Sequence, residues 1–410
     1  MAFADNPLNK PVTIVPVTRV THARLAILVF AAAALFLCVT PTSRARAEAL
    51  PQQLDDRTFW ALVSEFSEPN GFFRSDNLVS NETAFQHVIP TLQAQVVPVS
   101  AYVGVGPDQN FTYIAALKPR IAFIVDIRRQ NMLLHLMYKA IIEQSPTRAE
   151  FLSRLFSRPI PPGLSGTSTP DTMLAAYHNE DADPVAFARN EADITHVLMH
   201  DHGFALTRGD QQLIEYVYQA FYNAGPDIRY SFGRGSGWQP FPSYRDLMVE
   251  HDTQGVQRSY LATEDLYKAL RDLEQRNLIV PLVGDFGGPK ALRSVARFLD
   301  VHHATVSVFY TSNVEQYLFR DTAWQHFYEN VAAMPIDSHS TFIRAFFNNA
   351  GGRLRFPVPD PSSGPAPALP GSAPAVGPRS VTLLNPISLL LAAYFEGHIN
   401  SYIDVVELSR

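Results

Sequence analysis

The sequence predicts an α/β fold: a mainly parallel, doubly wound sheet with helical insertions. Continuous apolar runs such as IAFIV at residues 121–125 and LIVPLV at 278–283 alternate with segments of helical periodicity. A run without polar alternation is typical of a strand buried on both faces of a parallel sheet. In addition, residues 96–143 read as strand, glycine turn, helix, strand and helix, which is a right-handed crossover unit.

Composition and charge set limits on what the chain does. It has 410 residues, of which 46% are hydrophobic and 18% charged, an ordinary globular composition for one large domain or two smaller ones. The net charge of −6 argues against a broad nucleic-acid-binding surface. The neighbours Arg128 and Arg129 are expected to lie in solvent at a helix start. Cys38 is the single cysteine, so an intrachain disulfide is excluded.

The N-terminal segment has the features of a targeting signal. Residues 25–39 (LAILVFAAAALFLCV) carry no charge, Arg19 and Arg24 precede them, and the small-x-small sequence Ala-Arg-Ala follows at 45–47. This combination is typical of a cleaved secretory signal. The apolar run is shorter than the ~20 residues of a spanning helix, yet an uncleaved anchor remains an alternative. Residues 1–47 are therefore expected to be a signal peptide or a membrane anchor.

The first expected elements lead up to the crossover unit. Residues 57–65 predict a short helix. Ser80 is placed to cap a second helix that begins near Glu82 and is limited by Pro90. The elements expected next are a strand at 96–103, a helix at 110–117, a strand at 121–125 and a helix at 130–143.

The middle of the chain is expected to hold an insertion of short helices and loops at about 144–205. Thr207 and Asp210 then resemble a capping box, starting a helix that ends near Gly225. Residues 226–257 predict a long loop around GRGSGW. Further elements are expected as a helix at 264–277, a strand from 278 to Asp285, a helix at 290–300, a strand at 304–313, a helix at 324–331 and a strand at 340–347.

The domain organisation follows from these patterns. Residues 48–356 are expected to form the main α/β domain. Residues 357–379 are rich in Pro, Ala and Gly, and they predict a disordered loop. Residues 380–410 predict a helical segment that is too short to fold alone and docks on the main domain.

The candidate chemistry begins at the glycine turn. Gly104 and Gly106 stand where the first strand turns into a helix, and Asp126 ends the next strand. Glycine permits a sharp turn and the close approach of a ligand. An acid at the end of the second strand can accept hydrogen bonds from both hydroxyls of a ribose, in the crevice where open α/β sheets bind ligands. The alternative is an ordinary strand-to-helix turn with a helix-capping acid.

A family resemblance rests on these residues. YVGVGPDQN followed by IAFIVDIRRQN resembles the first two motifs of class I S-adenosylmethionine-dependent methyltransferases, and IVPLVGDFGG resembles their fourth-strand motif. The similarity covers roughly residues 57–347. The chain also resembles uncharacterised bacterial proteins that carry GVGPDQNFTYI. The resemblance implies a Rossmann-like, methyltransferase-type sheet and S-adenosylmethionine as cofactor. It also places the glycine turn at the methionine part, Asp126 at the ribose and Asp285 beside the methyl group or substrate.

The same resemblance assigns a role to the polar stretch SDNLVSNE at residues 75–82. It would lie over the cofactor and hydrogen-bond it; the alternative is a locally capped turn. Asp285 has the alternative role of capping the next helix, with Lys290 as a candidate ion-pair partner. Tyr310 and Asn313 either line the substrate side or serve as a core residue and a cap. The expected cofactor-binding residues are Gly104, Gly106, Asp126, Asp76, Asn77, Asn81, Glu82 and Asp285.

Some positions depart from the resemblance or exclude other chemistry. Tyr102 occupies the place of an acid two residues before the first motif glycine, and Asp108 replaces the third glycine. His196 and His200 share one face of a helix, but the glutamate of an H-E-x-x-H zinc site is absent, so no metal is expected. The sequence identifies no catalytic residue.

Two functional hypotheses follow. The first is a methyltransferase-like protein that binds S-adenosylmethionine or a related adenosyl ligand, with methyl transfer to an acceptor that the sequence does not identify. The second is an exported, non-catalytic ligand-binding or cell-envelope protein with a degenerate cofactor site. The N-terminal segment predicts export to the periplasm or medium, or membrane anchoring. A start codon further downstream would instead leave the protein in the cytoplasm, where this cofactor is made. The expected partner is a small molecule, with membrane contact only through an uncleaved N-terminal segment.

Overall fold

The computed structural model describes residues 49–96, 99–231, 241–347 and 380–409. The chain divides into two compact units, Met1–Ala47 and Glu48–Arg410, and the first lies outside the described residues. The expected signal or anchor and the expected disordered loop at 357–379 therefore also lie outside them. Within the described part, no helix has the length and apolar character required to cross a membrane.

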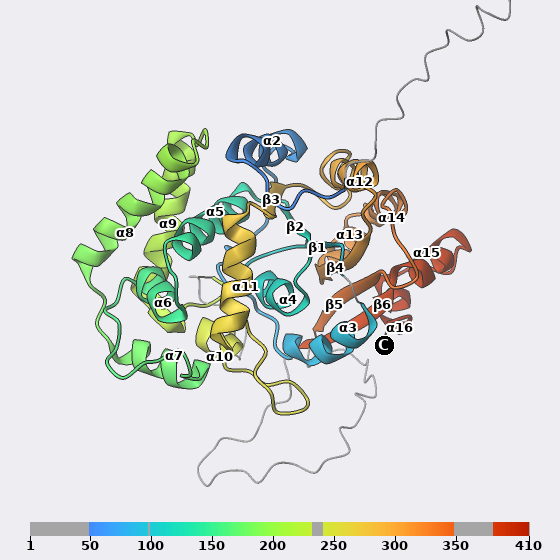
Figure 1. The fold of residues 1–410 in the computed structure, drawn as a ribbon. Coiled ribbons are helices and arrows are strands. Elements are labelled where there is room, and N and C mark those ends of the chain that lie inside the picture. Colours follow the sequence, from blue (N-terminus) through green and yellow to red (C-terminus); the bar gives the residue numbers. More distant parts are fainter. Residues whose placement is uncertain (1–48, 97–98, 232–240, 348–379, 410) are drawn as a thin grey trace, which may run out of the picture. The chain divides into compact units, whose positions relative to one another are not determined.

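A six-stranded sheet forms the centre of the second unit, with the order β3-β2-β1-β4-β5-β6 (Figure 1). The strands are β1 (Ala101–Gly104), β2 (Ile121–Asp126), β3 (Ile279–Val283), β4 (Val306–Ser312), β5 (Thr341–Phe347) and β6 (Ser380–Pro386). All neighbouring pairs are parallel except β5 and β6, which are antiparallel. The predicted α/β fold with a mainly parallel, doubly wound sheet is confirmed.

The chain order places a topological switch point between β1 and β4. From β1 the chain runs outward to β2 and β3, and it then returns to the other side of β1 to form β4 and β5. Every residue of β1, β2 and β3 is buried, as expected from the unbroken apolar runs. Open sheets of this kind bind ligands beyond the C-terminal strand ends at the switch point.

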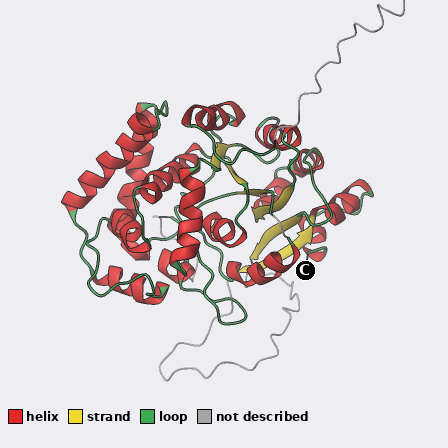
Figure 2. Ribbon diagram, in the orientation of Figure 1, coloured by secondary structure: helices red, strands yellow, loops and turns green. Residues whose placement is uncertain are grey.

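Helices cover both faces of the sheet (Figure 2). In the first half of the chain they are α2 (Asp56–Phe66), η1 (Phe85–Val88), α3 (Ile89–Gln95), α4 (Gln109–Leu117) and α5 (Arg129–Glu143). The prediction of a helix from Glu82, limited by Pro90, is wrong. Ser80 Oγ accepts a hydrogen bond from Glu82 N at 3.1 Å in a local turn, and helix begins only at η1. Pro90 lies in the first turn of α3, where proline is tolerated.

Residues 148–224 form a group of helices beside α5 (Figure 1). They are α6 (Arg148–Phe156), α7 (Pro170–Asn179), α8 (Pro184–His196), the π-helical turn η2 (Val197–Asp201) and α9 (Arg208–Ala224). The capping box predicted from Thr207 and Asp210 is confirmed at the start of α9. The expected loop at 226–257 holds two short helices, η3 (Gly225–Asp227) and α10 (Tyr244–Met248), while GRGSGW lies outside the described residues.

The second half completes both helical layers with α11 (Glu264–Gln275), α12 (Ala291–Val301), α13 (Val314–Arg320), α14 (Trp324–Ala332), α15 (Ile387–Phe395) and α16 (Tyr402–Glu407). The sequence did not predict α13. The expectation that 380–410 is helical from its start is also wrong, because β6 comes first and pairs with the whole of β5. The segment does dock on the domain: Tyr402 OH donates to Ala345 O of β5 at 3.3 Å.

Candidate ligand-binding site

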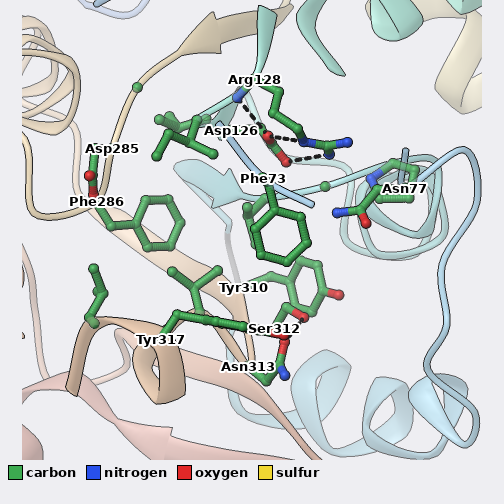
Figure 3. A pocket seen from close by; sticks show the side chains of 18 of the residues that line it. Phe73, Asn77, Asp126, Arg128, Asp285, Phe286, Tyr310, Ser312, Asn313 and Tyr317 are labelled. Carbon is green, nitrogen blue, oxygen red and sulfur yellow. Dashed lines mark hydrogen bonds and ion pairs between the residues drawn. The ribbon is translucent and has the colours of Figure 1, made fainter. Parts of the chain in front are cut away.

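A cavity of about 210 Å³ lies beyond the C-terminal ends of the central strands (Figure 3). Its walls come from residues 72–82, from the turn between β1 and α4, from the residues after β2 and β3, and from the end of β4 with α13. Figure 3 shows side chains from these separate segments around one space. The cavity therefore occupies the crevice at the switch point of the sheet.

Most of the sequence-predicted site residues meet in this cavity. Those that line it are Gly106, Asp126, Asn77, Asn81, Glu82 and Asp285. Gly104 and Asp76 do not line it. The structure gives each of these two a supporting position.

Gly106 is the glycine of the turn that faces the cavity. Its φ of +79° lies in the left-handed region that favours glycine, and a Cβ placed there would meet no atom within 4 Å. Its carbonyl accepts hydrogen bonds from His135 Nε2 at 2.8 Å and from Asn110 Nδ2 at 3.2 Å. Burial lowers the pKa of His135 to about 4, so the neutral ring donates this bond at physiological pH. Hydrogen bonds from Asn110 and His135 thus fix the carbonyl of Gly106, while the space next to its Cα stays open.

Gly104 serves the packing behind the turn. A Cβ at this position would lie 1.9 Å from Asn110 Oδ1 and 2.7 Å from Tyr102 Cε1. Asn110 Oδ1 accepts a hydrogen bond from Tyr102 OH at 2.9 Å, and its Nδ2 donates to Pro107 O at 2.7 Å. A glycine is therefore required at position 104 because a Cβ there would displace Asn110, which ties β1 to the turn. The sequence had predicted a ligand contact for Gly104 instead.

Asp126 ends β2 and forms a buried ion pair with Arg128 (Figure 3). Asp126 Oδ1 accepts from Arg128 N at 2.9 Å and from its Nε at 3.1 Å, and Asp126 Oδ2 accepts from its second guanidinium nitrogen at 3.2 Å. The prediction that Arg128 lies in solvent is wrong, since only 5% of the residue is exposed. The remaining guanidinium nitrogen donates to the carbonyls of Ser75 at 3.0 Å and Asp76 at 2.5 Å.

These bonds define the part that Asp76 plays. Its backbone carbonyl anchors Arg128, while its carboxylate accepts a hydrogen bond from Tyr216 OH at 3.3 Å. Arg128 thereby joins the segment at 75–76 to the end of β2. The neighbouring Arg129 pairs with Asp210 at the start of α9, with its Nε 2.5 Å from Asp210 Oδ1. Both arginines therefore cross-link elements of the fold.

Glu82 places a carboxyl group in the cavity wall although the residue is only 1% exposed. It accepts hydrogen bonds from Gln109 Nε2 at 2.9 Å, from Tyr310 OH at 2.9 Å and from Ser312 Oγ. Burial raises the pKa of Glu82, and these three donors offset only part of that shift. Among the described residues Glu82 has no ion-pair partner. A buried acid without a counter-charge is suited to a positively charged ligand.

The asparagines of the polar stretch supply further unpaired groups. Asn77 has a φ of +50°, and its Oδ1 is buried without a hydrogen-bond partner among the described residues. Asn77 and Asn81 both line the cavity. Because buried polar atoms in proteins are nearly always hydrogen-bonded, the orphaned oxygen of Asn77 points to a ligand or a bound water.

Asp285 lines the cavity from the end of β3. Its assignment to a fourth-strand motif is wrong, because Ile279–Val283 is the third strand and lies at the sheet edge beside β2. Asp285 Oδ1 accepts from Gly287 N at 2.9 Å in a local turn. The expected pairing with Lys290 is also absent, since Lys290 Nζ donates to Ser67 O at 2.8 Å.

The alternative role of Asp285 as a helix cap falls to another residue. Glu68 Oε1 accepts from the backbone nitrogens of Lys290 at 2.8 Å and Ala291 at 2.9 Å, at the start of α12. Glu68 Oε2 accepts from Asp285 N at 3.0 Å. The carboxylate of Glu68 therefore caps the N-terminus of α12. The side chain of Asp285 takes no part in this cap.

Several residues of the cavity wall were not predicted from the sequence, or were given two alternative roles. Phe73 and Tyr317 were missed; their rings meet edge to face with centroids 5.3 Å apart, and Arg128 lies 5.8 Å from the Phe73 centroid. Tyr310, left open, is a buried residue that also lines the cavity, and Asn313 lines it without making a side-chain cap. The pair Phe72–Phe73 just before a polar stretch was a usable signal, whereas Tyr317 lies on the unpredicted α13.

Asp108, which replaces the third glycine, lies behind the turn and does not line the cavity. It is 1% exposed, its Oδ1 has no partner among the described residues, and Tyr260 OH lies 3.4 Å from Oδ2. Burial raises the pKa of Asp108 to about 7. The carboxyl group of Asp108 therefore faces Tyr260 and not the cavity.

The two histidines considered for zinc lie outside the cavity. The rings of His196 and His200 stack with centroids 5.0 Å apart, and His196 Nε2 lies 3.3 Å from Asp201 Oδ1. Across residues 49–96, 99–231, 241–347 and 380–409, no group of three or more His, Cys, Asp or Glu side chains is arranged to hold a metal ion.

The comparison with known proteins gives a family. A family model described as a domain of unknown function (DUF7790) matches residues 77–159 and 174–365, about two thirds of the chain. No curated protein matches the sequence. The matched residues include the glycine turn, the acids at the ends of β2 and β3, and most of the cavity wall. The chain belongs to the DUF7790 family of domains of unknown function.

Proposed function

We propose that this protein binds S-adenosylmethionine or a related adenosyl ligand in the cavity at the switch point. One observation carries the proposal. The open glycine of the β1 turn, Gly106, and the acid that ends β2, Asp126, line one cavity together with the polar residues of the 77–82 segment. This is the position where a turn of backbone and a strand-end acid together hold a nucleoside in open α/β sheets.

Asp126 is the group that accepts a hydrogen bond from a ribose hydroxyl in this proposal. A carboxylate offers about four acceptor positions, and the bonds from Arg128 occupy three of them, only one of which is on Oδ2. Arg128 fixes the orientation of the carboxylate, and the remaining acceptor position of Oδ2 is available to a ligand hydroxyl. The ion pair thus acts as a support that positions Asp126.

The charge of the cavity favours a ligand that carries a positive group. Four acids of the described part of the chain line it, and two of them form ion pairs: Asp126 with Arg128, and Asp321 with Arg320. Glu82 and Asp285 have no ion-pair partner among the described residues. A sulfonium or amino group near Glu82 would supply the missing counter-charge, and the interaction is strong because this site is shielded from water.

For methyl transfer, the protein's task is to bind and orient the two reactants. The cofactor, when bound, supplies an activated methyl group that an acceptor attacks in line. Positioning alone accounts for a large part of the rate in such reactions. Phe73, Phe286 and Tyr317 give the cavity apolar walls that exclude water.

The proposal is tested by calorimetric titration of the purified chain with S-adenosylmethionine and with S-adenosylhomocysteine. We expect micromolar binding of both. Gly106→Val is the matched site variant, because its side chain would enter the cavity, and we expect it to abolish binding. Gly255→Val is the control: this glycine also has a positive φ, +76°, with open space around it, and it does not line the cavity. Equal binding by the two variants would exclude the turn from the site.

A second candidate function is that of an exported, non-catalytic binding protein with the same cavity. The observation that favours it is the ion pair that already engages both oxygens of Asp126, together with an acid, Asp108, in place of the third motif glycine. This candidate predicts ligand binding without methyl transfer, and a mature N-terminus close to Glu48. N-terminal sequencing of the protein from its native host distinguishes a cleaved signal from an anchored or cytoplasmic chain.

A further inference from the structure

A second cavity, of about 510 Å³, adjoins the candidate site. The two cavities share the five wall residues Asn81, Tyr230, Asn313, Tyr317 and Arg320. Because the same side chains face both spaces, a molecule in the second cavity would lie next to a ligand in the first. This shared wall places the second cavity where a reaction partner of an adenosyl ligand would have to bind.

The second cavity has the opposite charge character. Among the residues that the structure describes, its lining contains two arginines, Arg74 and Arg320, and no carboxylate. Arg74 is exposed and forms no ion pair with another described residue. Arg320 pairs with Asp321, which lines only the first cavity. Two guanidinium groups beside one space favour a carboxylate or phosphate group.

The rest of the lining favours a flat ring. The rings of Tyr230 and Phe241 lie 4.9 Å apart at an angle of 44°, and the Arg320 guanidinium lies 5.2 Å from the centre of the Tyr317 ring. Burial raises the pKa of Tyr230 to about 12, so its hydroxyl remains a hydrogen-bond donor at neutral pH. Aromatic walls combined with a few polar groups are typical of sites that bind planar molecules.

We infer that the second cavity is a subsite for an aromatic molecule that carries a carboxylate or phosphate group. The arginines bind the anion, the aromatic side chains contact the ring, and the amides of Asn81 and Asn313 stand at the boundary with the adenosyl site. As the acceptor side of a transfer reaction, this subsite rests on the proposed function. As a binding site for an aryl anion, it stands on its own lining.

The test uses phenyl phosphate and benzoate as probes, titrated into the full chain and followed by calorimetry or ligand-observed NMR. Phenol is the control without an anion, and inorganic phosphate is the control without a ring. We expect at least one of the aryl anions to bind more tightly than both controls. Arg74→Gln should weaken this binding about tenfold through loss of a charge-assisted hydrogen bond. Arg57→Gln, an exposed arginine on α2, should have no effect.

The outcomes separate this inference from the proposed function. Arg74 lines only the second cavity, so Arg74→Gln should leave the affinity for S-adenosylhomocysteine unchanged. Binding of S-adenosylhomocysteine without binding of either aryl anion overturns the subsite alone. Binding of an aryl anion that depends on Arg74, in a chain that binds no adenosyl ligand, upholds the subsite and overturns the proposed function. The inference is overturned if neither phenyl phosphate nor benzoate binds more tightly than phenol and inorganic phosphate. It is also overturned if the affinity for the aryl anion is unchanged in Arg74→Gln.

Discussion

Replacing Asp126 with asparagine affects both stability and binding, and the structure allows the two effects to be separated. The substitution removes the counter-charge of Arg128, whose side chain is 6% exposed. Removing one partner of a buried ion pair costs about 3–5 kcal/mol, because the other charge remains buried and unpaired. Asparagine keeps one acceptor oxygen for Arg128, so we expect about 3 kcal/mol, the lower end of that range.

A loss of this size is measurable without unfolding the protein. Domains are commonly stable by about 5–15 kcal/mol, so the variant should remain folded. For a unit that spans Glu48–Arg410, with an unfolding entropy of about 2.1 cal/mol/K per residue, the expected decrease in Tm is about 4 °C. Urea titration followed by circular dichroism gives the change in unfolding free energy directly.

The double variant Asp126→Asn/Arg128→Gln distinguishes the two roles of Asp126. The double variant leaves no unpaired buried charge, so the part of the loss that comes from the isolated Arg128 charge should return, whereas the bonds of Arg128 to the carbonyls of Ser75 and Asp76 stay lost. Binding of S-adenosylhomocysteine should not return, because the ribose acceptor is still missing. Arg128→Gln alone should bind measurably but more weakly than the wild type, since Asp126 remains but its carboxylate is no longer oriented by the guanidinium. A double variant that binds as tightly as the wild type would refute the assignment of Asp126, and a single variant with unchanged stability would refute the argument from the buried pair.

Three further predictions follow from neighbouring residues. Gly106→Ala should cost only about 1–2 kcal/mol of strain at its positive φ, whereas Gly104→Ala should cost about 3 kcal/mol or more because its Cβ collides with Asn110; urea titration compares them. The pKa of Asp108 is raised to about 7 in the folded state, so the folded state keeps this proton and the contribution of Asp108 to wild-type stability falls as pH rises from about 4 to 7, by on the order of 4 kcal/mol. Asp108→Asn should remove this decrease, and an unchanged pH profile of unfolding would refute it. Glu82→Gln should weaken the binding of S-adenosylmethionine about tenfold more than that of S-adenosylhomocysteine, which lacks the sulfonium charge; equal losses would show that Glu82 does not face the sulfonium.

The sequence predicted those parts of the fold that depend on local pattern. The strands β1, β2 and β3 were predictable because they are buried on both faces and therefore read as continuous apolar runs. The strand β6 was not, because its buried positions are irregular and its pairing is with the edge strand β5. The helix α13 has seven residues, too few for a helical period to be recognised in the sequence, and Asn313 at its N-cap makes no side-chain cap.

The residues of the site were likewise predictable only where their position depends on the local sequence. Gly106 and Asp126 both line the cavity. Their position was predictable because a glycine turn and the end of a strand can be recognised in the local sequence. Gly104 and Gly106 look alike in the sequence, and only the backbone conformation separates the packing glycine from the open one. The burial of Arg128 depends on the carbonyl of Ser75, 53 residues away, and no local pattern reports such a contact.

The most direct test of the account is a calorimetric titration of S-adenosylhomocysteine into the wild-type chain and into the Asp126→Asn/Arg128→Gln variant, side by side. The account predicts micromolar binding to the wild type and no measurable binding to the variant, which circular dichroism should show to be folded. Absence of binding to the wild type at millimolar ligand would contradict an adenosyl site at the end of β2. Equal binding to both proteins would place the ligand elsewhere.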